Sequence, residues 1–183
     1  MGLDMYLSKK TYVKKWDHYK EADKYDVVVT KGGKPTNIKP ERVTYVIEEL
    51  GYWRKANQIH AWFIENCNNG DDNNGSCYVE RAKLEELLKI CKEISQFKLV
   101  KGQVENGARY IEGKRVPSME DGELLSDEDK ARCEELLPTT SGFFFGSTDY
   151  DQYYMEDVKN TVKILEDALA DEEADEFEYR ASW

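Results

Sequence analysis

A histidine and two cysteines are the residues of this sequence best suited to chemistry. His60 lies on the apolar face of an expected helix, and Cys67 and Cys77 flank a short segment rich in Asn, Asp and Gly. An imidazole and two thiolates suit Zn²⁺, and Asp4 or Asp149 could supply a further ligand. None of the standard zinc spacings is present, so a core histidine bonded to a backbone carbonyl or a carboxylate is the alternative interpretation.

A second set of polar residues lies on segments that otherwise consist of packing residues. Besides Asp4 and His60, it includes Arg54 and Asp149. Polar side chains need partners when they are buried, so this set predicts either a structural polar network or a small catalytic or metal site. The sequence contains no nucleophile elbow, no phosphate-binding loop and no paired-carboxylate pattern, and we therefore expect a protein that is not an enzyme.

Charge is separated along the chain. Residues 1–118 hold 21 Lys and Arg against 17 Asp and Glu, whereas residues 119–183 hold 5 against 20. An acidic region of this kind repels nucleic acid and attracts basic grooves, so we expect no direct binding of free DNA or RNA. The predicted contacts with a partner are five late acidic residues and one aromatic residue that a strand would leave exposed: Asp171, Glu172, Glu173, Asp175, Glu176 and Phe144.

Two interpretations of these acidic residues stay open. A run of carboxylates on a helix is commonly a solvated face. Spaced along a rigid helix, the same carboxylates could imitate the phosphates of duplex DNA and occupy a basic channel in a partner. An exposed aromatic ring such as that of Phe144 would then anchor the contact.

The bulk composition predicts a folded protein in a reducing compartment. Hydrophobic residues make up 40% of the chain and aromatic residues 12%, which is enough to supply a core. No apolar run approaches the roughly 18 residues of a membrane span, and the first ten residues do not resemble a signal peptide. The four cysteines form no CxxC pair, so free thiols and a cytoplasmic location without membrane contact are expected.

Hydrophobic periodicity predicts an α+β fold in which a small, mostly antiparallel sheet packs with three to four helices. The expected helices cover residues 52–66, 80–96, 126–137 and 150–172. The expected strands cover residues 1–7, 25–29, 41–46, 142–146 and 177–181, and residues 77–79 form a brief extended piece. We expect Ser147, Thr148 and Asp149 to cap the last helix, and the last strand to lie at an edge of the sheet.

The chain is expected to form a single domain over residues 1–183. Residues 97–125 interrupt two helices that could otherwise join, and a glycine turn within them predicts an inserted hairpin. Residues 166–183 are expected to hold the acidic end of the last helix and the final strand.

Three segments of the chain resemble a widespread family of small bacteriophage and prophage proteins. They are MGLDMYL at the start, residues 52–60 in the first expected helix, and residues 142–151 before the last one. The likeness covers most of the chain but not residues 97–125, which that family usually lacks. The chain is also similar to type II-A anti-CRISPR proteins, phage inhibitors of the RNA-guided effector nuclease, among which a metal-binding member is known.

This resemblance implies a phage protein that acts in the bacterial cytoplasm on a type II-A CRISPR effector nuclease carrying its guide RNA. Together with the acidic charge, it predicts a binding protein that occupies a basic surface of the effector and blocks the loading of target DNA. Two alternatives stay open. One is a metal-dependent phage accessory enzyme with Asp4, His60 and Asp149 at its centre, and the other is a phage structural or regulatory protein.

Overall fold

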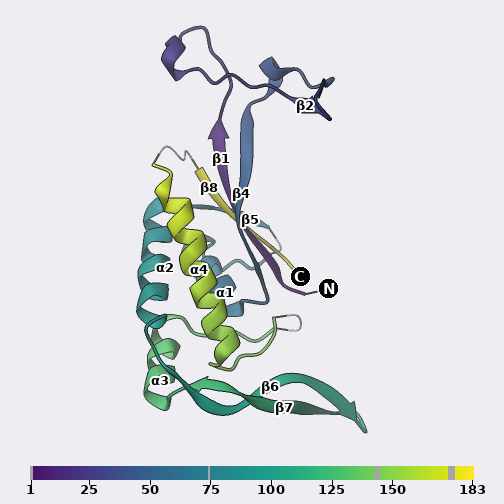
Figure 1. Ribbon diagram of the computed structural model, residues 1–183, viewed down its shortest axis with the longest axis vertical. Helices are drawn as coiled ribbons and strands as arrows, with labels where there is room; N and C mark the ends of the chain where they lie inside the picture. The colour runs from purple at the N-terminus through teal and green to yellow at the C-terminus, as the bar shows by residue number, and fades with distance from the viewer. Residues whose placement is uncertain (1, 74, 143–144, 173–175) are drawn as a thin grey trace.

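A computed structural model of the protein describes residues 2–73, 75–142, 145–172 and 176–183 (Figure 1). Phe144, Glu173 and Asp175, which belong to the predicted partner contacts, lie outside these ranges, as does the middle of the strand predicted at 142–146. Within them, the chain forms an antiparallel sheet that shares one hydrophobic core with the helices. The predicted α+β fold is confirmed.

The central sheet has four strands in the order β4-β1-β8-β5. These strands are β1 (Asp4–Tyr12), β4 (Tyr45–Arg54), β5 (Ser76–Val79) and β8 (Glu176–Ser182). The helices are α1 (Asn57–Cys67), α2 (Arg81–Ile94), α3 (Asp127–Leu136) and α4 (Gln152–Ala170). Two further hairpins pair β2 (Thr30–Lys31) with β3 (Lys34–Pro35), and β6 (Leu99–Ile111) with β7 (Lys114–Leu125).

Alternation along the strands gives the sheet a buried face. Leu3, Met5 and Leu7 are fully buried because every second side chain near β1 points toward the helices. Trp53 of β4 reaches the same core, where its Nε1 donates a hydrogen bond to Oγ1 of Thr161 in α4 at 2.8 Å. The helices therefore pack on the face that carries these apolar residues, and the other face carries the intervening polar ones.

The helix α4 lies directly against β4. A Cβ atom at Gly51 would stand 2.3 Å from Cγ2 of Ile164, so this close approach requires glycine. The contact fixes the distance between α4 and β4. No helix in the described ranges, the 19-residue α4 included, is both long and apolar enough to cross a membrane.

The prediction that the first helix begins at residue 52 is wrong. Residues 52–54 belong to β4, where Arg54 pairs with Asp4 and Trp53 with Met5 across the ladder. Lys55 then takes a φ of 63° and donates its backbone N–H to the carbonyl of Leu3 at 2.8 Å, which ends the strand. The apolar spacing after residue 52 suits a helix, but pairing with β1 outweighs it.

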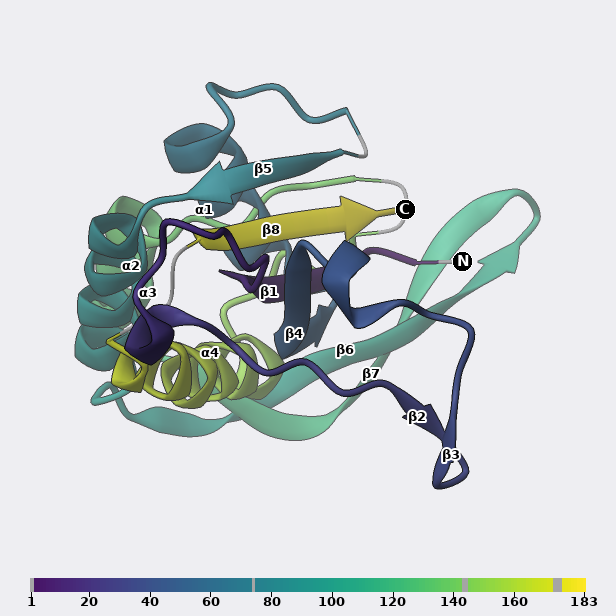
Figure 2. The same cartoon turned by 90° about the horizontal axis from the view of Figure 1, so that it is seen from above.

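The prediction that the last strand lies at an edge of the sheet is also wrong, because β8 is a central strand. It pairs antiparallel with β1 on one side and with β5 on the other, as the view from above shows (Figure 2). Nor does the last helix reach the acidic residues at 171–178: α4 ends at Ala170, and Glu176 and Glu178 lie on β8. These carboxylates therefore do not line one rigid helix.

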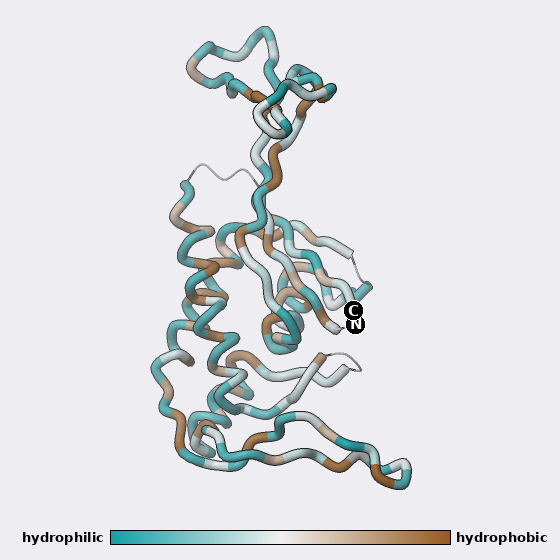
Figure 3. Tube along the Cα trace, turned by 45° about the vertical axis from the view of Figure 1, so that its right-hand side comes forward, coloured by the Kyte–Doolittle hydropathy of each residue, from teal (hydrophilic) through white to brown (hydrophobic). Residues whose placement is uncertain are grey.

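Two segments project from this body at opposite ends (Figure 3). The hairpin predicted within residues 97–125 is confirmed as β6 and β7, and its turn at Glu112 and Gly113 has φ values of 50° and 76°. Val104 at its base is 1% exposed, whereas Tyr110 near its tip is 75% exposed. The other projection, residues 13–44, has no regular element at the predicted strand 25–29, and the strand predicted at 41–46 begins only at Tyr45.

Candidate binding site at the start of α4

His60 lies in the core, and both of its ring nitrogens have partners. Its Nδ1 lies 2.8 Å from the hydroxyl oxygen of Tyr179, and its Nε2 lies 3.1 Å from Oδ1 of Asp72. A carboxylate accepts hydrogen bonds and does not donate them, so the neutral ring donates from Nε2 and accepts the Tyr179 hydroxyl at Nδ1. Burial lowers the pKa of His60, which keeps the ring neutral at pH 7.

Cys67 and Cys77 lie near each other, half-buried at the margin of the core. Burial raises the pKa of the Cys67 thiol to about 12, with a smaller contribution from Cys77, and burial also raises the pKa of Cys77. Thiolates are the metal-binding form of cysteine, and this environment favours the protonated thiols.

Asp4, the fourth predicted ligand, belongs to the other face of the sheet. Its neighbours Leu3 and Met5 point into the core, and its own carboxylate accepts a hydrogen bond from the hydroxyl of Tyr52. Among the described residues, no three His, Cys, Asp or Glu side chains gather closely enough to hold a metal ion. The zinc site stays a prediction.

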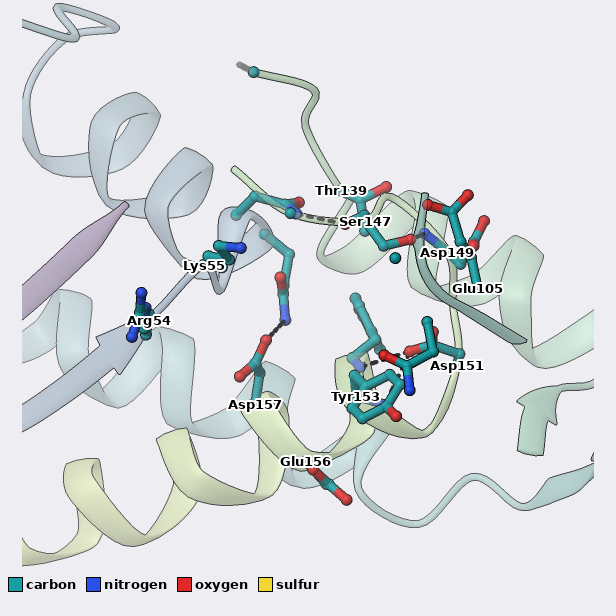
Figure 4. Close-up of a pocket in the computed structure, with 17 residues that line it drawn as sticks. Arg54, Lys55, Glu105, Thr139, Ser147, Asp149, Asp151, Tyr153, Glu156 and Asp157 are labelled. Atoms are coloured by element: carbon teal, nitrogen blue, oxygen red, sulfur yellow. Dashed lines mark hydrogen bonds between the residues drawn. The ribbon is translucent and has the colours of Figure 1, made fainter. Parts of the chain in front are cut away.

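Arg54 and Asp149, the remaining members of the predicted polar set, both line a cavity of about 670 Å³ (Figure 4). The cavity opens where four segments meet: the junction of β4 and α1, a bulged part of β6, the loop before α4, and the first two turns of α4. Its lining includes five acidic residues, which we call the acidic cavity residues: Glu105, Asp149, Asp151, Glu156 and Asp157. Two basic residues, Arg54 and Lys55, also line it.

Asn57 in the first turn of α1 holds the cavity wall together. It is 2% exposed, and its Nδ2 donates to the carbonyl oxygens of Phe145 and Ser147 at 3.1 and 2.7 Å. Its Oδ1 accepts the backbone N–H of Thr140 at 2.9 Å. One amide therefore ties the loop of residues 139–149 to α1 at three points.

The loop approaches Lys55 at Gly146. This glycine has a φ of 90°, and a Cβ atom there would stand 3.2 Å from Cβ of Lys55. Glycine alone adopts such a conformation at this distance without strain. The close contact places the loop beside the end of β4, which forms one side of the cavity.

Asp151 caps α4 and is almost completely buried, with 1% of its surface exposed. Its Oδ1 accepts the backbone N–H groups of Tyr153 and Tyr154 at 2.9 and 3.0 Å. Its Oδ2 is buried without a hydrogen-bond partner among the described atoms. Burial raises the pKa of Asp151, and the two backbone hydrogen bonds oppose that shift. The predicted cap at Ser147, Thr148 and Asp149 is thus wrong by two residues or more.

Asp157 lies farther along α4 in the same cavity. Burial raises its pKa from 3.8 to about 7, and the charges of Glu156 and Asp151 add to this effect. A hydrogen bond that Gln58 Nε2 donates to Asp157 Oδ2 at 3.3 Å opposes it. The charge of Asp151 therefore raises the pKa of Asp157, and burial makes the ionised form of both carboxyl groups less favourable.

Sequence reasoning found Arg54 and Asp149 but missed Asp151, Asp157 and Asn57. One signal was available: Asp151 stands three residues before Tyr154, where the apolar stripe of α4 begins, which is the position of an N-cap. No sequence signal places Glu105, since the bulge between Glu105 and Ala108 brings it in from the hairpin.

The acidic residues predicted to contact a partner lie elsewhere, near the junction of α4 and β8. Asp171 forms an ion pair with Lys9 at 2.5 Å, so its charge is partly neutralised. Glu172 and Glu176 are exposed. Within the described ranges, Glu172 and Glu176 are therefore the two acidic residues of this predicted set that are exposed.

Comparison of the chain with protein-family models, with curated proteins and with solved structures finds no match.

Proposed function

We propose that this protein is an acidic binding protein whose partner presents a basic surface, and that the acidic cavity residues form the centre of the contact. The observation that carries this proposal is that four of these residues have no ion-pair partner in the part of the chain that the structure describes. Within the described ranges, Asp149, Asp151, Glu156 and Asp157 form no ion pair with Lys or Arg. Carboxylates left unpaired around a cavity favour a positively charged partner.

The rim of the cavity extends this acidic surface onto the hairpin. Glu120 of β7 accepts a hydrogen bond from the hydroxyl of Tyr153 at 3.2 Å and another from Nδ2 of Asn106 at 2.9 Å. Tyr153 and Asn106 both line the cavity, so β7 and the cavity form one continuous surface. Tyrosine beside carboxylates is a combination typical of protein interfaces.

The resemblance to phage inhibitors supports a particular partner, the type II-A CRISPR effector nuclease with its guide RNA. Such an effector holds nucleic acid in a positively charged channel and reads the DNA with arginines. An acidic protein seated there would block the loading of target DNA in the bacterial cytoplasm. Glu172 and Glu176 follow the opposite end of α4 and lie outside the cavity.

The proposal is tested by association kinetics with a guide-loaded type II-A effector nuclease. Glu156→Lys should slow association about tenfold at low salt, and the difference should shrink as salt rises, because screening weakens charge steering. Asp167→Lys is the matched control, since it places the same charge change at an exposed site on α4 outside the cavity. The effector should also lose DNA binding when the protein is present.

Equal effects of the two variants would remove the cavity from the contact. A double variant, Glu172→Lys with Glu176→Lys, tests whether the surface near β8 carries the binding instead. Absence of any complex with the effector at micromolar concentration would overturn the proposal as a whole.

A further inference from the structure

We infer that the acidic cavity receives the guanidinium or ammonium group of an arginine or lysine side chain that a protein partner inserts. This inference rests on the proposed function and makes it specific, because it names the group recognised. Two independent observations carry it: Asp149, Asp151, Glu156 and Asp157 line the cavity without an ion pair in the described ranges, and the Oδ2 atom of Asp151 is buried without a hydrogen-bond partner.

The Oδ2 atom of Asp151 points to a ligand with hydrogen-bond donors. Capping α4 requires only Oδ1, so the fold gains no bond from Oδ2. A buried carboxylate oxygen without a partner is costly, and asparagine would cap the helix equally well without the charge. A charged acceptor kept in the cavity wall is expected where a bound donor compensates for it.

Asp157 supplies a second acceptor on the same helix. Gln58 occupies its Oδ2 with one long hydrogen bond of 3.3 Å, and no cation pairs with the carboxylate in the described part of the chain. A planar guanidinium carries five N–H donors in a fan, so it can reach carboxylates that stand apart.

A metal ion fits this cavity less well than an organic cation. Hard cations need several oxygen ligands converging within about 2.6 Å of one point. No such group of three acidic side chains occurs in the described ranges, and half of Asp151 is committed to the helix cap. The volume of about 670 Å³ suits a side chain with part of its backbone.

The two basic residues of the cavity do not take the place of the bound cation. Arg54 and Lys55 lie beside Gly2, since a Cβ atom there would stand 3.5 Å from Cε of Lys55 and 3.9 Å from Nε of Arg54. Figure 4 shows both on the side of the cavity away from Asp149 and Asp151. Glu105, Asp149 and Asp151 form the opposite side of the cavity, and Asp157 lies between the two sides (Figure 4).

The test uses the full chain and blocked amino acids as probes, followed by calorimetry and by NMR shifts of the α4 amides. N-acetyl-arginine amide should bind, and N-acetyl-citrulline amide, a neutral analogue of nearly the same shape, should bind at least tenfold more weakly. Asp151→Asn and Asp157→Asn should each weaken binding of the arginine probe about tenfold, and Asp167→Asn should leave it unchanged. Equal binding of the two probes, or no effect of Asp151→Asn, would overturn the inference.

A third probe, spermidine, distinguishes the source of the cation. Tighter binding of spermidine than of the arginine and lysine amides would overturn a side chain as the ligand and assign the cavity to a free polyamine. The complex with the effector is measured in parallel. A complex that forms unchanged with Asp151→Asn overturns this inference and leaves the proposed function standing, whereas a probe that binds without any complex overturns only the proposed function.

Discussion

His60 and Asp151 are both buried polar residues, each with 1% of its surface exposed, yet their hydrogen bonding differs. Both nitrogens of His60 have partners, whereas Asp151 uses one carboxylate oxygen and leaves the other without a bond. Rings of Phe145 and Trp183 also enclose the imidazole, with centroids at 5.1 and 5.3 Å. Asp151 instead borders a cavity.

The difference separates a structural polar group from one available to a ligand. A buried group with all of its hydrogen bonds made stabilises one arrangement of the core and offers nothing to a partner. A buried charge with an unmade bond weakens the folded state until something binds it. Stability and binding should therefore respond in opposite ways at the two residues, and the following predictions test that contrast.

The largest effect is expected at His60. His60→Ala removes the contacts to Tyr179 and Asp72 and leaves a void in the core, which should lower the free energy of unfolding by about 3 kcal/mol. Urea unfolding measures this loss. The chain has two histidines, and His18→Ala is the matched control because His18 is exposed. Similar stabilities of the two variants would contradict a structural role for His60.

A smaller effect is expected from pH at Asp157. Its pKa rises from 3.8 to about 7 on folding, so the folded protein holds this proton more tightly than the unfolded chain does. The stabilisation is complete below about pH 4 and is lost as pH rises to 7. We expect a loss of about 1–2 kcal/mol after discounting for partial solvent contact, and Asp157→Asn should abolish that slope. Urea unfolding across this range measures it.

Asp151→Asn should raise stability by about 1 kcal/mol near neutral pH, because the amide keeps the cap and removes a buried charge. Asp151→Ala should instead lower stability by about 1 kcal/mol, because the cap itself is lost. Melting temperatures of the two variants provide the measurement. If both variants lose stability, the carboxylate is satisfied in solution and its contrast with His60 disappears.

The smallest effect is expected from metal removal. Both ring nitrogens of His60 are occupied, so we expect EDTA to shift the melting temperature by less than about one degree. Elemental analysis of the protein purified without added metal is the companion measurement. One zinc per chain, together with a clear drop in melting temperature on chelation, would support the predicted zinc site.

The sequence predicted the elements whose signals are local. The hairpin of β6 and β7 and the helix α2 follow from turn residues and apolar spacing. It failed where a distant segment decides the outcome. Residues 52–54 carry a spacing that suits a helix, and only the pairing of β4 with β1 makes them a strand.

The site shows the same division. Arg54 and Asp149 could be selected because charged residues are unusual on segments devoted to packing. The unmade bond of Asp151 could not be predicted, because it depends on which atoms surround its Oδ2 after folding. The spacing in the sequence can identify Asp151 as a helix cap, but it cannot show that the same residue also lines a cavity.

The pairing of β8 with β1 also affects how the chain reaches its folded state. Asp4 lies opposite Ser182, so the centre of the sheet joins segments separated by almost the entire described chain. Closing so long a loop costs entropy before any contact compensates for it, and folding that depends on such pairings is slow. During synthesis on the ribosome, β1 can pair with β4, but β5 must wait for β8, the strand that lies between β5 and β1. We therefore expect this sheet to be completed only once β8 has emerged from the ribosome.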